Sequence, residues 1–270
     1  MPRPRTGATA DTPKVLSKAL AILESFTAAT PERSESQIAR ELGLSTSTTN
    51  RLLRGLAERA FLARLPDGRY CLGPTIVRIG RQAAASLDYA RVFAPILEAT
   101  ARRTGETAML AILVPGGLEA RYVASVESPH RLRVTVAIGS SVPLTAGATA
   151  KALLAYCPPE VIDAALAVPR APLADGTLLD PAVLRTELAS IRERGWSRSW
   201  QETSDGAWAV AAPILDRTGQ PIAAVGVATP THRHTSASEA ATATAVLDAA
   251  RDATALVFGP PALGEAPEDA

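Results

Sequence analysis

The first sixty residues place apolar and polar positions with the period of short α-helices. Apolar side chains between residues 15 and 26 recur three or four positions apart, which predicts one amphipathic helix. A second helix begins after Ser34, with Gln37 three residues later as in a capping box, and ends at Gly43. A third helix follows Ser45, and its predicted inward face is Leu52, Leu53, Leu56 and Ala57.

Two short strands are predicted directly after these helices. They span Leu62–Leu65 and Arg69–Leu72 and flank the turn sequence Pro66-Asp67-Gly68. Ala39 and Gly43, four residues apart, suit the close crossing and the tight turn of a helix-turn-helix. A helix-turn-helix followed by a β-hairpin is a winged helix, whose third helix enters the major groove of DNA.

Polar residues of the third helix and basic residues of the hairpin are the candidate DNA contacts. Asn can pair with adenine, Arg with guanine or phosphate, and hydroxyl groups with bases or phosphates. The candidates are Ser45, Thr46, Ser47, Thr49, Asn50, Arg51 and Arg54 on the helix, with Arg64 and Arg69 on the hairpin. Residues 1–73 carry 11 basic and 7 acidic side chains (net +4), and residues 74–270 carry 17 and 20 (net −3). The positive front of the chain suits DNA. The alternative is a three-helix module that binds another protein through a solvated polar face.

Two further helices are predicted at about Pro74–Ala85 and Leu87–Thr104, because Pro74 suits a first helical turn. Ile76, Val77 and Ile79 form an apolar stripe on the first of them. This stripe is either core or a surface on which two protomers pair. Pairing is attractive, because two-fold symmetry doubles the length of DNA that is read.

From Glu106 onward the pattern becomes a mixture of strands and helices, typical of an α+β domain. A strand, a Pro-Gly-Gly turn and a second strand cover residues 107–128, and "LRVTVAIG" at residues 132–139 predicts another strand. Helices are predicted from about Ala148, and at Pro159–Ala167, Pro181–Arg194 and Ser236–Val257.

Two apolar tracts of small residues, joined by Asp216–Pro221, are predicted to pair as an antiparallel hairpin. With Leu215 opposite Ile222, Ala211 faces Gly226 and Ala209 faces Ala228. One face of the hairpin then carries only Ala207, Ala209, Ala211, Ala224, Gly226 and Ala228, and the other carries Trp208, Val210, Ile214, Val225 and Val227. A bare face either lets a helix approach closely or leaves a hollow for a ligand. The helix start at residues 146–148 favours the hollow, because free backbone N–H groups there attract carboxylates.

The sequence offers little catalytic chemistry. Neither Cys71 nor Cys157 has a candidate base beside it, and His232 and His234 lack a third metal ligand nearby. The sequence "GATAKA" lacks the order of a phosphate-binding loop. We therefore expect no catalytic residue, no metal and no cofactor. No apolar run approaches the ~18 residues of a membrane span, and the N-terminus lacks the apolar core of a secretory signal, so we expect a soluble cytoplasmic protein.

The chain resembles the IclR family of transcriptional regulators from about Val15 to Arg233. In the front half the resemblance rests on "ALAILESF", "IARELGLSTSTTNRLLRGLAERAFL" and "GRYCLGPTIVRIG". In the back half it rests on "RYVASVES", "PLTAGATAKALLA" and "GWSRSWQETSDGAWAVAAPILD". The family signature falls on Gly195, Ser199, Glu202, Ala209-Val210-Ala211 and Asp216. Leu215 departs from it, because an aromatic residue or His is usual at that position.

This resemblance implies an α/β (α+β) chain with an N-terminal winged helix-turn-helix, a linker helix and a C-terminal GAF-like effector-binding domain with an antiparallel sheet. The implied division is a disordered arm at 1–12, the winged helix at 13–73, the linker at 74–90, the effector-binding domain at 91–258 and a disordered tail at 259–270. The implied partners are double-stranded operator DNA, a small organic acid as effector, and further copies of the chain in a homodimer or a dimer of dimers.

The family's pocket positions fall on Ala146, Gly147, Ala148, Ser199, Ala209, Gly226 and Ala228. Relatives can carry Cys or Ser where this chain has Ala or Gly, so we expect a wider, less polar pocket that suits an aromatic or branched acid. The expected function is a ligand-responsive transcriptional regulator, with repression favoured over activation. The alternative is an enzyme built on a GAF-like domain with an accessory DNA-binding module.

Overall fold

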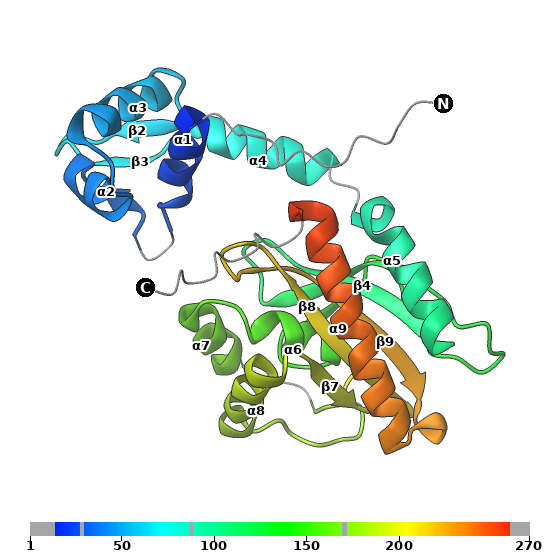
Figure 1. Ribbon diagram of the computed structural model, residues 1–270. Helices are drawn as coiled ribbons and strands as arrows, with labels where there is room; N and C mark the ends of the chain where they lie inside the picture. Colours follow the sequence, from blue (N-terminus) through cyan, green and yellow to red (C-terminus); the bar gives the residue numbers. More distant parts are fainter. Residues whose placement is uncertain (1–13, 28–29, 87–88, 169–171, 260–270) are drawn as a thin grey trace, which may run out of the picture. The chain divides into compact units, whose positions relative to one another are not determined.

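The chain divides into two compact units, residues 1–87 and 88–270, and the computed structural model describes residues 14–27, 30–86, 89–168 and 172–259 (Figure 1). The boundary between the units falls inside the expected linker segment, 74–90. The expected N-terminal arm and, apart from Gly259, the expected C-terminal tail lie outside the described residues.

The first unit is a winged helix. Its helices are α1 (Lys14–Glu24), α2 (Glu35–Glu41), α3 (Thr46–Glu58) and α4 (Pro74–Ser86), and its antiparallel sheet has the order β1 (Glu32–Arg33), β3 (Tyr70–Leu72), β2 (Leu62–Arg64). The capping box of Ser34 and Gln37 forms as predicted. Gly43 turns the chain between α2 and α3 with a φ of +61°, which glycine adopts without strain. The two-residue strand β1 was not predicted, because so short a segment has no periodicity to read.

The core of this unit uses fewer apolar residues than the sequence pattern indicates. Ile22, Phe26, Ile38, Leu53, Leu62 and Tyr70 are buried together. Val15, Leu16 and Leu20 of α1 are exposed instead. Val77 and Ile79 of α4 are also exposed, at 55% and 41%, so these two residues of the predicted stripe do not belong to the core of this unit.

The second unit is a six-stranded antiparallel sheet with helices on both faces (Figure 1). The strand order is β6 (Ser141–Pro143), β5 (Glu119–Val126), β4 (Thr107–Leu113), β9 (Pro221–Pro230), β8 (Ala207–Leu215), β7 (Ser197–Trp200). Helices α5 (Tyr89–Thr104) and α9 (Ser236–Phe258) cover one face, and α6 (Ala148–Leu154), α7 (Pro159–Ala167) and α8 (Pro181–Arg194) lie on the other. Within the described part of the chain, no helix combines the length and hydropathy needed to cross a bilayer.

The predicted strand at residues 132–139 is wrong. Strand β6 pairs with the free edge of β5. Next to it, the Tyr122 N–H donates to the Ser140 carbonyl, and the Tyr122 carbonyl accepts from the Gly139 N–H. Val134 and Val136 pack on the α6 side of the sheet, whereas Leu132 and Ile138 are exposed. Residues 132–138 therefore cross the sheet face without joining the ladder, and Gly139 bonds to β5 where the chain approaches β6.

The predicted hairpin of small residues forms as β8 and β9. Ala211 lies opposite Gly226 and Ala209 opposite Ala228, as expected. Leu215 lies opposite Pro221, not Ile222, because the register shifts by one residue between Ile214 and Leu215 close to the turn. The bulky face, with Trp208, Val210, Ile214, Val225 and Val227, packs under α5 and α9.

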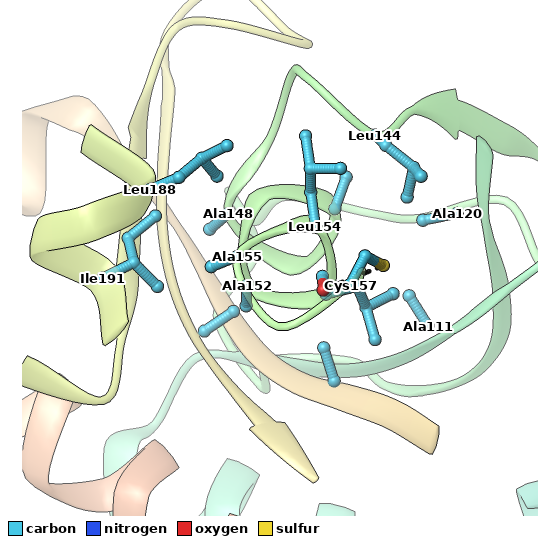
Figure 2. Close-up of a cluster of buried hydrophobic side chains, with 14 of the residues drawn as sticks. Ala111, Ala120, Leu144, Ala148, Ala152, Leu154, Ala155, Cys157, Leu188 and Ile191 are labelled. Atoms are coloured by element: carbon cyan, nitrogen blue, oxygen red, sulfur yellow. Dashed lines mark hydrogen bonds between the residues drawn. The ribbon is translucent and has the colours of Figure 1, made fainter. Parts of the chain in front are cut away.

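Helix α6 occupies part of the bare face, and all seven of its residues are buried. A Cβ on Gly226 would lie only 2.7 Å from Cγ2 of Thr149, so glycine is what allows this close approach. Figure 2 shows α6 enclosed between Leu188 and Ile191 on one side and Ala111 and Ala120 on the other. The bare face therefore admits a helix along part of its length.

Candidate functional site

The exposed face of α3 gathers most of the predicted DNA contacts. Thr46, Ser47, Asn50, Arg51 and Arg54 line one shallow hollow, together with Glu35, Gly55 and Glu58. Ser45 is exposed just before this helix and caps it, because its hydroxyl accepts the Thr48 N–H at 3.4 Å. Two guanidinium groups and several uncharged polar groups therefore project from one side of a helix.

The prediction that Thr49 lies on this exposed face is wrong. Its side chain is fully buried, and its hydroxyl donates to the Ser45 carbonyl at 3.1 Å. Thr49 lies four residues before Leu53, so both side chains point to the same inward face of α3.

Asn50 is held by a carboxylate from the preceding helix. Its Nδ2 donates to Oε2 of Glu35 at 2.9 Å, which spans from α3 to the first residue of α2. Because one amide hydrogen is used in this way, the other hydrogen and Oδ1 of Asn50 are left for a base edge.

The two arginines of the wing differ in their partners. Arg69 pairs with Glu32 at 2.8 Å and with Asp67 at 2.6 Å. The bond to Asp67 raises the pKa of Arg69, and the bonds from Arg69 lower the pKa of Asp67. Arg64 instead places its guanidinium 6.0 Å from the ring centre of Tyr70, and none of the ion pairs among the described residues involves it. Arg64 therefore carries the less compensated charge.

A cavity of about 230 Å³ lies in the second unit, where α6 begins. Five of the seven predicted pocket residues line it: Gly147, Ala148, Ser199, Ala209 and Ala228. Ser199 lies opposite Ala209 in the β7–β8 ladder, so a hydroxyl and a methyl share this wall. The hydroxyl of Ser199 makes no hydrogen bond to the part of the chain that the structure describes.

The other two predicted pocket residues lie elsewhere. Gly226 is covered by Thr149 of α6, and Ala146 lines a neighbouring cavity. Ala207, which the sequence places on the bare face, also lines the cavity. Sequence reasoning missed the other residues that complete the lining: Met109, Tyr122, Val134, Thr135, Val136, Ala137, Ser140, Val142, Thr203, Ser204 and Trp208. The apolar run at residues 132–139 is the available signal, although its pattern predicts a strand and not the wall of a cavity. Burial raises the pKa of the Tyr122 phenol, so this group is neutral at pH 7.

The start of α6 already holds a carboxylate of the protein itself. The Gly147 N–H donates to Oε2 of Glu202 at 2.8 Å, and the Ala146 N–H donates to the Pro143 carbonyl at 3.1 Å. Of the three backbone N–H groups expected to be free, only that of Ala148 has no acceptor among the described residues. A ligand carboxylate at Gly147 would compete with Glu202.

Glu202 is fixed by a buried lysine. Lys151, which is 1% exposed, places its Nζ 2.5 Å from Glu202 Oε1 and 2.7 Å from Glu187 Oε1. One ammonium group thus joins α6 to α8 and to the loop after β7. The burial of Lys151 is compensated by two carboxylates.

Neither nucleophilic nor metal chemistry is assembled in the described parts of the chain. The described residues that line the cavity of Ser199 include no His, Cys, Asp or Glu that could act as its base. Burial raises the pKa of Cys157 to about 11, which keeps its thiol protonated. Among the described residues no group of three His, Cys, Asp or Glu side chains could hold a metal ion.

His234 belongs to an aromatic cluster. Trp200 and Trp208 meet its ring edge-on at 5.0 and 4.8 Å, and its Nε2 lies 2.8 Å from Glu239. The third tryptophan, Trp196, lies under the guanidinium of Arg194 at 4.3 Å. These contacts give the three tryptophans packing roles.

Comparisons with known proteins agree with this architecture. Residues 15–66 match the IclR helix-turn-helix domain, and residues 81–255 match the bacterial transcriptional regulator IclR C-terminal domain. The chain is 30% identical to the HTH-type transcriptional regulator KipR of Bacillus subtilis over 80% of its length and 85% of that protein. It is 29% identical to the transcriptional repressor IclR of Escherichia coli over 90% of its length and 89% of that protein.

The crystal structure of the Thermotoga maritima IclR has the same fold. It superposes with a TM-score of 0.60 at 26% identity, over 90% of this chain and 98% of that chain. The matches cover both units, and the relatives are named as regulators and not as enzymes. The chain therefore belongs to the IclR family and is a transcriptional regulator with a helix-turn-helix DNA-binding domain and a C-terminal effector domain.

Proposed function

We propose that the protein is a repressor whose affinity for operator DNA is controlled by a small organic acid. This acid is aromatic or branched and binds in the cavity beside α6. The observation that carries this proposal is the cavity itself, with a floor of small side chains that includes Ala209 and Ala228. Its volume of about 230 Å³ lies just below the ~300–1,000 Å³ of pockets for drug-sized ligands. A single ring or a short branched chain suits that space.

The hydroxyl groups of the lining support an acid as the ligand. The described lining residues of this cavity are all uncharged at pH 7. Ser199 and Thr135 offer hydroxyls that bond to no described residue, so they can donate to a carboxylate. Because Gly147 already binds Glu202, we assign recognition of the acid to these hydroxyls and to the Ala148 N–H, and not to the Gly147 N–H.

Filling the floor of the cavity tests this assignment. Ala209→Leu is expected to weaken binding of benzoate or isovalerate at least tenfold, because the added branched side chain occupies the space of the ligand. Ser199→Ala is expected to weaken it about two- to tenfold through the loss of one hydrogen bond. Isothermal titration calorimetry measures both, and unchanged affinity for operator DNA is the control. Tight binding of only two- or three-carbon acids by the native protein would contradict the proposed ligand class.

The exposed face of α3 and the wing are proposed to hold the operator. Arg51 and Arg54 lie beside Thr46, Ser47 and Asn50, which suits a helix in the major groove. Arg64 is proposed as the phosphate contact of the wing, with Arg69 secondary because Glu32 and Asp67 neutralise it.

The salt dependence of DNA binding separates the two wing arginines. Arg64→Ala is expected to make the negative slope of log affinity against log salt less steep by about 1, the value for one lost phosphate contact. Arg69→Ala is the matched change and is expected to move the slope much less. Fluorescence anisotropy on a DNA fragment that the protein retains from genomic DNA measures both slopes. A larger change for Arg69→Ala would contradict the assignment.

We further propose that the protein works in the cytoplasm as a homodimer or a dimer of dimers. Val77 and Ile79 of α4 support pairing, because these apolar side chains are 55% and 41% exposed and a second copy would bury them away from water. Two copies would also present two recognition helices to one operator.

A charge on α4 tests the pairing surface. Val77→Glu and Ile79→Glu are expected to shift the protein toward monomers and to weaken operator binding, because each places a carboxylate in an apolar interface. Arg78→Ala, on the same helix, is expected to leave the assembly intact. Sedimentation equilibrium measures the mass of each variant, and native-like assembly of both glutamate variants would exclude this surface.

A further inference from the structure

A second cavity lies beside the first and is larger and more apolar. Its volume is about 340 Å³, and its apolar lining includes Leu118, Val142, Ala165, Leu173 and Leu179. Val142 and Thr203 line both cavities, so the two share a wall. We propose that this second cavity is a separate binding site for a neutral, largely apolar molecule that carries one hydroxyl group.

The outer wall of the second cavity is held in place by hydrogen bonds. The Leu173 N–H donates to the Thr177 carbonyl and the Gly176 N–H to the Leu173 carbonyl, both at 2.8 Å. The Ala174 N–H donates to the Glu202 carbonyl at 3.1 Å, which ties this turn to the loop after β7. Hydrogen bonds of a turn therefore fix Leu173 in the lining of the second cavity.

Two polar groups on the wall suit a hydroxyl. Glu202 accepts from Lys151 and from Gly147, one bond on each carboxylate oxygen, and each oxygen keeps a second acceptor site. The hydroxyl of Thr145, which also lines the cavity, is buried without a partner among the described residues. A few polar groups in an apolar pocket fix the orientation of a small ligand.

The local charge selects against an anion. Glu202 is the one charged side chain among the described lining residues of the second cavity. Its counter-ion, Lys151, is shared with Glu187, so two carboxylates face one ammonium group. An acid would add a third negative charge, whereas a neutral alcohol or phenol would not. The two cavities are therefore proposed to bind different classes of ligand. The proposal for the second cavity does not depend on which effector binds in the first.

A matched pair of brominated probes tests the site in the native protein. Crystals of the full chain are soaked with 4-bromophenol or with 4-bromobenzoate, which have similar shape but differ in charge at pH 7. Anomalous scattering is expected to place the bromine of 4-bromophenol among Leu118, Leu173 and Leu179, with no 4-bromobenzoate there. Bromophenol in the first cavity alone, bromophenol in neither cavity, or bromobenzoate in the second cavity overturns the proposal.

Solution binding extends the test. Leu173→Trp is expected to weaken 4-bromophenol binding at least tenfold in calorimetry by filling the second cavity, and Ala209→Leu in the first cavity is expected to change it less than twofold. The reverse order overturns the proposal. Circular dichroism shows whether each variant is folded. If Leu173→Trp is unfolded, the anomalous map of the native protein alone decides whether 4-bromophenol binds in the second cavity.

Discussion

The contact between Thr149 and Gly226 determines how closely α6 lies on the sheet. A methyl group on Gly226 would stand 2.7 Å from the Thr149 side chain, so the helix can occupy this position only above a residue without Cβ. Ala211 and Ala224 extend the same low surface on the strands beneath it. The sheet is equally bare at Ala209 and Ala228, which lie opposite one another beyond the start of the helix. One run of small residues thus accommodates both a buried helix and a cavity.

Lys151 connects this packing to the loops around the cavities. Its ammonium group is almost fully buried between Glu187 of α8 and Glu202 of the loop after β7. Removing one partner from a buried ion pair typically costs roughly 3–5 kcal/mol, because the remaining charge is left without compensation. Glu202 is therefore held against the start of α6, where it binds Gly147 on the wall of the first cavity and itself lines the second. A ligand that displaces Glu202 would disturb both cavities through one group.

The sequence predicted the elements with strong periodicity and missed those that depend on distant partners. The winged helix, α7, α8 and the β8–β9 register could be read from spacing, because a shift of one residue in that hairpin would exchange its bulky and bare faces. The segment at 132–139 has the composition of a strand, but β6 occupies the edge that it would need. The hydroxyl of Thr49 suggests the polar face of α3, although its position four residues before Leu53 places it on the inward face. Glu187 and Glu202 lie 36 and 51 residues from Lys151, so no local pattern could reveal that this lysine is buried.

The stability of a double variant tests most directly whether the Thr149–Gly226 contact holds this arrangement. Gly226→Ala is expected to lower the free energy of unfolding by about 1–3 kcal/mol, as other overpacked cores do. Thr149→Ser removes the methyl group that the new Cβ would meet, so in the double variant Gly226→Ala should cost less than half of what it costs alone. Urea unfolding of the native protein, both single variants and the double variant gives the four values. A Gly226→Ala protein as stable as the native one, or an equal cost in both backgrounds, would contradict the account.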